Sequence, residues 1–201
     1  MYKLLVTTAA VAGETDFGTF TDTRDGQTYK TVKIGEQTWM AQNLNYKTKD
    51  GSWCYDNKAD NCKQYGRLYD WKTAKTVCPN GWKLPDTADW NRLVLTAGEK
   101  GLEDETLKAK SGWKEDCDGN KNCNGTDNYG FSALPGGYRD DDGSFEYAGY
   151  DGNWWTATEM DDIYVYTRNM KCCSPQWGSR VKVDGYYESY GLSVRCVADR
   201  P

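Results

Sequence analysis

The chain has 201 residues, which fits one domain with at most a small appendage. It carries 25 Lys and Arg residues against 30 Asp and Glu residues, and the basic residues are scattered, so the composition argues against a nucleic-acid partner. Histidine is absent, which removes the usual general base, the histidine-dependent nucleophilic arrangements and most catalytic zinc sites. No apolar run reaches the length of a membrane span.

Eight cysteines are many for a cytosolic protein, and they indicate an oxidising compartment. Two pairs lie close together in the sequence, Cys54 with Cys62 and Cys117 with Cys123, each in a loop rich in Asp, Asn and Lys. Such loops bury too little apolar surface to hold themselves, so we expect a local disulfide in each. A zinc cluster would need unusual ligand spacing, because the chain has no histidine and no Cys-x-x-Cys pair.

Cys172 and Cys173 are adjacent in the sequence and leave three alternatives open. They form a vicinal disulfide with each other, they pair with another protein, or one pairs within this chain and the other stays a thiol. A vicinal bond would stiffen a loop between two predicted strands, where a binding site could lie.

In chain order, residues 1–19 form a lead-in that is compatible with a signal-peptide remnant, a cloning remnant or an edge strand. Residues 20–201 form the predicted single domain. Within 29–41, apolar and polar residues alternate on both sides of Gly35-Glu36, which is typical of a β-hairpin. Residues 46–65 are expected to be a polar loop.

Helical spacing of apolar residues predicts a helix within 68–77, ended by Pro79. A second helix is predicted after Pro85, capped by Asp86 or Thr87, and a short third one near 102–110. The later part of the chain contains the patterns of strands, over 154–158, 163–168 and 192–197. Helices in the first half and strands in the second predict an α+β fold.

Short motifs follow one another along 20–198: TDTRDGQTY (21–29), VKIG (32–35), QTWMAQNL (37–44), YGRLYDW (65–71), CPNGWKLP (78–85), GFSALPGGYR (130–139), WWTATE (154–159) and SVRCV (193–197). In this order they resemble a bacterial family of secreted or surface-attached proteins, the Fibrobacter succinogenes major paralogous domain. The family looks C-type-lectin-like and is distantly similar to formylglycine-generating enzymes. The resemblance implies a disulfide between Cys78 and Cys196 that closes the fold.

The implied fold is a C-type-lectin-like α+β domain with an N-terminal hairpin, two main helices, a twisted antiparallel sheet and long disulfide-stapled loops. The chain departs from sugar-binding C-type lectins, because it has no Glu-Pro-Asn, Gln-Pro-Asp or Trp-Asn-Asp triplet. It also departs from formylglycine-generating enzymes, because the adjacent Cys172 and Cys173 cannot clamp copper in that family's manner. Neither activity is therefore expected in its usual form.

Nine Trp and fifteen Tyr supply many candidate ligand contacts, since aromatic faces stack on the apolar faces of sugar rings. We expect four tryptophans on predicted apolar faces to belong to the core, namely Trp39, Trp71, Trp82 and Trp90. Strand alternation should bury one residue of Trp154-Trp155 and present the other. The loop surface over 138–155 and 170–190 supplies the predicted ligand-binding residues, Arg139, Tyr147, Tyr150, Trp154, Trp155, Trp177, Tyr186 and Tyr187, with Trp53 and Tyr190 as further loop aromatics.

Acidic residues in the same region are candidate calcium ligands, because calcium takes six to eight oxygens from flexible loops. The first set of candidates is Asp140, Asp141, Asp142 and Glu159. A second lies in the loop of Cys117 and consists of Asp116, Asp118 and Asn120. The alternative for both is a solvated acidic turn, and no cofactor is required by the predicted function.

The sequence thus predicts a non-catalytic recognition module that is secreted or held at a bacterial cell surface. The expected ligand is a polysaccharide, bound through loop aromatics. The alternative is a protein-interaction or structural module of an adhesion apparatus, and a hydrolase or a formylglycine-generating-like enzyme is the least favoured interpretation. No nucleic acid and no membrane span are expected.

Overall fold

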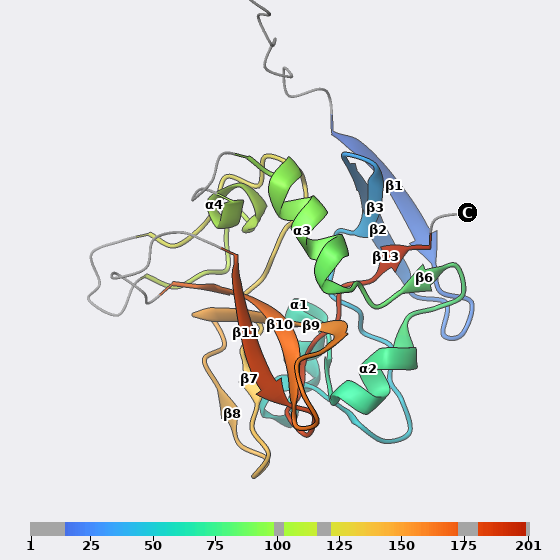
Figure 1. Cartoon of the computed structure of the whole chain (residues 1–201), viewed down its shortest axis with the longest axis vertical. Coiled ribbons are helices and arrows are strands. Elements are labelled where there is room, and N and C mark those ends of the chain that lie inside the picture. The colour runs from blue at the N-terminus through green and yellow to red at the C-terminus, as the bar shows by residue number, and fades with distance from the viewer. Residues whose placement is uncertain (1–14, 99–102, 116–121, 173–180, 200–201) are drawn as a thin grey trace, which may run out of the picture.

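The computed structural model describes residues 15–98, 103–115, 122–172 and 181–199, which fold into two main β-sheets with short helices packed against them (Figure 1). One sheet has the strand order β1-β2-β3-β13-β6, and the other has the order β11-β10-β9-β12-β5-β4. A separate two-stranded sheet pairs β7 with β8. The α+β class predicted from the sequence is confirmed.

The strands of the first sheet are β1 (Asp16–Thr21), β2 (Thr28–Ile34), β3 (Gln37–Met40), β6 (Trp82–Lys83) and β13 (Val197–Ala198). Those of the second are β4 (Ser52–Trp53), β5 (Leu68–Tyr69), β9 (Asp151–Glu159), β10 (Tyr164–Lys171), β11 (Lys182–Tyr187) and β12 (Leu192–Ser193). The small sheet consists of β7 (Tyr138–Arg139) and β8 (Phe145–Glu146). The helices are η1 (Tyr55–Asn57), α1 (Ala59–Tyr65), α2 (Trp71–Val77), α3 (Thr87–Thr96) and α4 (Glu103–Leu107).

The predicted hairpin is formed by β2 and β3, which pair antiparallel up to Ile34 opposite Gln37. Gly35 takes a φ of 59°, the left-handed conformation that a tight two-residue turn requires and that glycine adopts without strain. The end of the lead-in is the edge strand β1, which pairs antiparallel along its length with β2. Residues 16–19 of the lead-in lie in this edge strand, whereas residues 1–14 lie outside the described residues.

The helices begin where side chains can cap them. Asp70 accepts a hydrogen bond from the Thr73 amide at the start of α2, so the helix begins after the short strand β5. Asp86 and Asp89 form a reciprocal capping box at the start of α3, as the sequence signal at Asp86 predicts. Helix α1 lies in the segment that we expected to be a polar loop. The sequence does not predict this helix, because only Cys62 among its residues is buried and the apolar periodicity of a helix is missing.

Strand β9 separates the two hydrophobic cores of the protein. Trp154 packs into one core with Trp90 and Trp39, and Trp155 packs into the other with Tyr69. Both Trp154 and Trp155 are 0% exposed, so the prediction that one of them is presented to solvent is wrong. Alternation does send the two side chains to opposite faces, but β9 is a central strand whose two faces are both covered.

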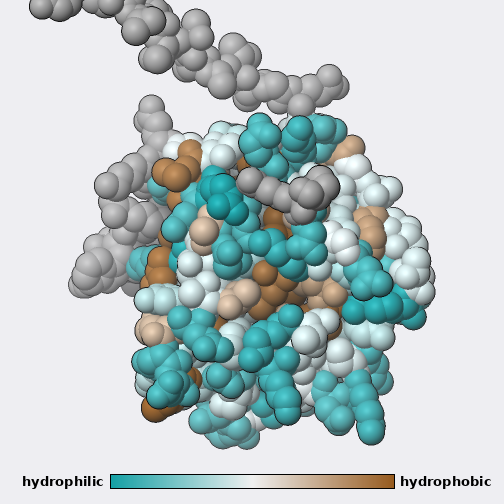
Figure 2. Space-filling view, turned by 45° about the vertical axis from the view of Figure 1, so that its right-hand side comes forward, coloured by the Kyte–Doolittle hydropathy of each residue, from teal (hydrophilic) through white to brown (hydrophobic). Residues whose placement is uncertain are grey.

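Of the four tryptophans predicted to be buried, Trp39, Trp71 and Trp90 are in the core and Trp82 is half-buried. The face of the molecule on the side of β1, β6 and α2 is mostly hydrophilic around a smaller hydrophobic area (Figure 2).

Three disulfides join described residues. The pairs Cys54–Cys62 and Cys78–Cys196 are as predicted. The third bond joins Cys123 to Cys172, with 5.4 Å between their Cα atoms, and it overturns both the Cys117–Cys123 pairing and the vicinal Cys172–Cys173 bond. The pairings predicted from closeness in sequence are wrong, because the tertiary fold brings Cys172, the residue after β10, beside Cys123.

Cys117 and Cys173 lie outside the described residues. The Cys123–Cys172 bond agrees with the third alternative for the adjacent cysteines, in which one of the two pairs within the chain. The disulfides place the protein in an oxidising environment outside the cytoplasm. Within the described segments, no helix has the length and apolar character to cross a membrane.

A buried arginine joins the separate segments of the fold. Arg195 is 0% exposed and donates two hydrogen bonds to the Asn43 Oδ1 atom, at 3.0 and 2.8 Å. Its other donors reach the carbonyls of Met40, Phe131 and Ser132, and its guanidinium lies 4.5 Å from the centre of the Phe131 ring. Burial lowers the pKa of Arg195 to about 9, because the charged form has lost its hydration.

We expect Arg195→Met to lower the free energy of unfolding by about 2–4 kcal/mol, because buried carbonyls then lose their donor. Chemical denaturation followed by tryptophan fluorescence measures this. Lys63→Met, which removes a surface ion pair on α1, is the control and should leave stability unchanged. A variant at position 195 as stable as the parent would contradict the structural role of Arg195.

The disulfide pattern makes a second prediction. Peptide mapping of the unreduced protein should link Cys123 to Cys172 and Cys54 to Cys62, and the Cys172→Ser variant should expose one thiol at Cys123. Thiol labelling followed by mass spectrometry tests both. A peptide that joins Cys117 to Cys123, or Cys172 to Cys173, would show that the pairing described here is wrong.

Candidate functional site

Six tyrosines gather where β7, β10 and β11 meet, in the lower part of Figure 1. We call this group the tyrosine cluster. Its members are Tyr138, Tyr147, Tyr164, Tyr186, Tyr187 and Tyr190.

Each ring of the cluster contacts at least one other. Tyr138 is central, with its ring centre 5.9 Å from that of Tyr147, 5.6 Å from that of Tyr186 and 5.9 Å from that of Tyr190. Tyr187 extends the cluster from Tyr190, at 6.0 Å. The cluster is partly open to solvent, since Tyr147 is 53% and Tyr187 is 41% exposed.

Tyr164 joins the cluster through Tyr187, because the two are cross-strand partners on β10 and β11. Their ring centres are 4.6 Å apart and their hydroxyl oxygens are 2.8 Å apart. The register of this antiparallel pair therefore sets the far end of the cluster.

The strand register of β7 brings Tyr138 beside Tyr190. Arg139 and Gly191 exchange two backbone hydrogen bonds, of 2.9 and 2.8 Å, so the residues before them lie near each other. A Cβ atom at Gly191 would come within 2.9 Å of the Arg139 Cβ atom, so only glycine permits this close approach. The tyrosine cluster thus depends on a glycine between β11 and β12.

Arg139 lies beside the cluster and is held in place by two contacts. Its guanidinium carbon sits 4.3 Å from the centre of the Trp53 ring, a cation–π contact, and its Nη1 atom donates to the Asp140 carbonyl at 3.2 Å. The neighbouring ring of Tyr55 contacts Phe145 on β8 at 5.4 Å. Aromatic groups therefore continue past the cluster onto β4 and β8.

A row of polar residues lies on the sheet face that carries Tyr186. Asn153 on β9 is the direct cross-strand partner of Asn169 on β10, and Thr167 follows on the same face opposite Asp184 of β11. The Asn169 amide donates to the Asp184 carboxylate at 3.1 Å. Asn153, Asn169 and Thr167 are 0% exposed, whereas Asp184 is exposed at the edge of the sheet.

Asp151 is the most buried carboxylate beside this row, with 7% of its surface exposed. Burial raises its pKa, and the Lys171 ammonium, 3.7 Å away, partly offsets that rise. Burial also raises the pKa of Tyr138, to about 12, with a further contribution from nearby carboxylates. Tyr190 has its pKa raised by hydrogen bonding to Asp140 and by burial.

Four of the predicted ligand residues meet at this surface, namely Arg139, Tyr147, Tyr186 and Tyr187. Tyr150 is half-buried, and the Lys114 ammonium lies 4.7 Å from its ring centre. Trp154 and Trp155 lie in the cores and Trp177 lies outside the described residues. The sequence analysis included Tyr138 and Asn153 only within the range 138–155, and it missed Tyr164 and Asn169, although alternation along 164–169 was a usable signal.

The predicted calcium ligands have local partners instead. One Asp140 carboxylate oxygen accepts the Asp141 amide at 2.7 Å, and an Asp142 oxygen accepts the Ser144 amide at 2.8 Å. Within the described segments, no three acidic or cysteine side chains gather as a metal site would require. Glu159 ends β9, and the second candidate set, Asp116, Asp118 and Asn120, lies outside the described residues. Calcium binding stays a prediction.

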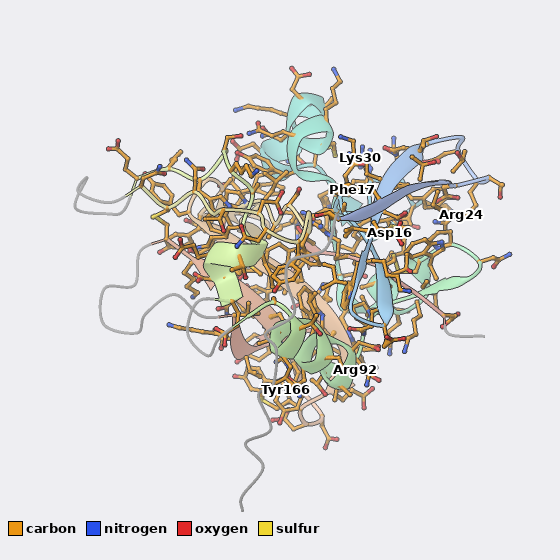
Figure 3. The ribbon with its side chains drawn as sticks, turned by 90° about the horizontal axis from the view of Figure 1, so that it is seen from above. Asp16, Phe17, Arg24, Lys30, Arg92 and Tyr166 are labelled. Carbon is orange, nitrogen blue, oxygen red and sulfur yellow. A yellow bond between two sulfur atoms is a disulfide. The ribbon has the colours of Figure 1, made fainter. Side chains whose placement is uncertain are left out.

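A cavity of about 420 Å³ lies where α3 meets the first sheet. Its central charge, Asp89, is buried and already bonded to Lys83 at 2.8 Å, to Gln37 at 3.2 Å and to Arg92. Figure 3 shows Arg92 on α3. Because these side chains satisfy one another, we assign them a structural role: the bond between Asp89 and Gln37 holds α3 against β3.

The chain matches the family model of the Fibrobacter succinogenes major domain over residues 32–198. It therefore belongs to this bacterial domain family, as the order of its motifs predicted. No curated protein and no solved structure matches the chain.

The raised pKa of Tyr138 predicts how stability changes in alkali. The folded state holds this phenol's proton above the ordinary pKa of 10, so stability is unaffected below pH 10 and falls as the pH rises towards 12. The Tyr138→Phe variant should lose less stability over that interval than the parent. Denaturation curves across alkaline pH measure this, and identical slopes for parent and variant would contradict it.

Proposed function

We propose that this protein is a non-catalytic recognition module that binds a polysaccharide through the tyrosine cluster, in a secreted or cell-surface setting. The observation that carries the proposal is the continuous, partly exposed set of tyrosine rings beside polar side chains. Aromatic rings offer large contact area at low entropic cost, and their faces match the apolar faces of pyranose rings.

The polar surroundings suit a sugar as well. Asp184 and Arg139 flank the rings with an acceptor and a donor, which fix the orientation of hydroxyl groups that stacking alone does not distinguish. The cluster needs little rearrangement to bind, because β7 is clamped to Gly191 and its rings already pack against each other. A rigid platform of this kind supports recognition without chemistry, in a chain that has no histidine.

A C-type-lectin-like fold is part of the same proposal. Strand β13, near the end of the described chain, lies between β3 and β6 in one sheet, so early and late strands pair. The Cys78–Cys196 disulfide closes this arrangement over a separation of 118 residues. Both features suit a domain that carries variable loops on a closed scaffold.

A protein-interaction role within an adhesion apparatus is the second candidate, and the edge strand β1 favours it. Phe17 is 59% exposed there and, with Gly18, Thr19 and Lys30, lines a cavity of about 410 Å³. Figure 3 shows Phe17 and Lys30 on the β1–β2 ribbon. An open edge can accept another strand, so this surface is suited to protein partners.

We expect purified, oxidised protein to bind at least one member of a panel of plant and microbial polysaccharides. Tyr187→Ala and Tyr147→Ala should each weaken that binding roughly threefold to tenfold, because each removes a stacking ring worth about 0.5–1.5 kcal/mol. Isothermal titration calorimetry with soluble oligosaccharides measures this, in calcium and in chelator.

Leu95→Ala is the matched control, because Leu95 is 80% exposed on α3, outside the cluster. If the protein binds in calcium but not in chelator, sugar binding requires calcium. Absence of binding to the whole panel would overturn the polysaccharide proposal and favour the protein-interaction role, and release of reducing sugar would overturn the non-catalytic one.

A further inference from the structure

The tyrosine cluster lies in a negative electrostatic environment. Besides burial, the carboxylates of Asp140, Glu146 and Asp151 raise the pKa of Tyr138. The carboxylates of Asp184 and Asp151 likewise add to the rise that burial causes in the pKa of Tyr186. Glu146 is the cross-strand partner of Tyr138 in the β7–β8 hairpin, and Asp184 precedes Tyr186 by two residues on the same face of β11. Carboxylates therefore surround the rings on three strands.

The basic groups near the cluster do not cancel this charge. Arg139 is held against Trp53, and Lys171 forms its ion pair with Asp151. Lys108 pairs with Asp104 at 3.0 Å. Lys182 acts on Asp151 from β11. Among the ion pairs that join described residues, none involves Asp140, Glu146 or Asp184, so these three carboxylates add negative charge near the tyrosines.

Three buried side-chain oxygen atoms on the sheet face that carries Tyr186 lack hydrogen-bond donors among the described residues. In the part of the chain that the structure describes, the amide oxygens of Asn153 and Asn169 and the hydroxyl of Thr167 have no hydrogen-bond partner, and all three residues are 0% exposed. They share one sheet face with Asp184 and Tyr186, and Asn153 and Asn169 are direct cross-strand neighbours. Because these oxygens are closed to solvent, they do not contact a bound sugar, and their unpaired lone pairs add negative potential on the face that carries Tyr186.

We propose that the tyrosine cluster selects polysaccharides built of amino sugars with free ammonium groups. The inference rests on the proposed sugar-binding function and specifies its ligand class. Tyrosine faces attract a cation through the ring quadrupole, and the surrounding carboxylates add charge attraction and accept hydrogen bonds from the three donors of each ammonium. A uronic-acid polymer would be repelled, because its carboxylates carry the same charge as Asp140, Glu146 and Asp184.

The test compares three oligosaccharides of equal length: oligomers of glucosamine, of N-acetylglucosamine and of galacturonic acid. At mildly acidic pH, where amines are protonated and carboxylates are ionised, we expect glucosamine oligomers to bind at least tenfold more tightly than the acetylated ones. The advantage should shrink as salt is added, and the galacturonate oligomer should not bind. Isothermal titration calorimetry measures all three.

The double variant Asp140→Asn, Glu146→Gln should remove most of the preference for glucosamine and leave the affinity for the acetylated oligomer within about twofold, because neither residue is assigned a contact with sugar hydroxyls. Glu36→Gln, in the β2–β3 turn, is the control that changes charge without touching the cluster and should leave the preference intact. Thermal midpoints of both variants verify folding.

Equal affinity for glucosamine and N-acetylglucosamine oligomers would overturn the amino-sugar proposal and leave the sugar-binding function standing. If none of the three oligosaccharides binds, the amino-sugar proposal is overturned, and the sugar-binding function then stands or falls with the wider polysaccharide panel. If an oligolysine peptide of matched charge binds as tightly as the glucosamine oligomer, the site recognises positive charge alone and the amino-sugar proposal is likewise overturned.

Discussion

The structure depends on the buried charge of Arg195, whose hydrogen-bond acceptors among the described residues are an asparagine side chain and backbone carbonyls. Arg195 follows the short strand β12, and its donors bind Asn43, the end of the β2–β3 hairpin and the segment before β7. Asn43 also accepts the Trp154 indole N–H at 2.9 Å, which ties the central strand β9 to the same point. Because a buried guanidinium tolerates few arrangements of its acceptors, this contact fixes how the two sheets and the hairpin meet.

That fixed scaffold explains why the candidate site can be built from short elements. Strands β7 and β12 have two residues each, too few to hold a position alone. Ser193 of β12 pairs with Trp154, and Arg139 of β7 pairs with Gly191, so both are anchored to the central sheet beside the arginine. The tyrosine cluster is thereby held on well-ordered backbone, while the Cys123–Cys172 bond joins the end of β10 to a distant segment.

The surface and the interior divide the aromatic residues between two roles. Trp39, Trp90 and Trp154 pack against one another at tilted angles in the core, where their large area supplies the stabilisation that short strands lack. The tyrosines of the cluster carry hydroxyls that must remain hydrated or bonded, and Tyr147 and Tyr187 are accordingly exposed. This division makes the tyrosines, and not the tryptophans, available for a ligand.

The sequence by itself determined the α+β class, the β2–β3 hairpin, the cap of α3, the Cys54–Cys62 pair and the family, because these follow from local patterns and motif order. It placed Arg139, Tyr147, Tyr186 and Tyr187 among the exposed aromatic and charged residues, but it also chose Trp154 and Trp155. Whether a strand is central or at an edge depends on its neighbours in space, so only the tertiary structure decided that both tryptophans are buried. For the same reason, only the fold decided that Cys172 meets Cys123 and that Tyr138 and Tyr190 lie side by side.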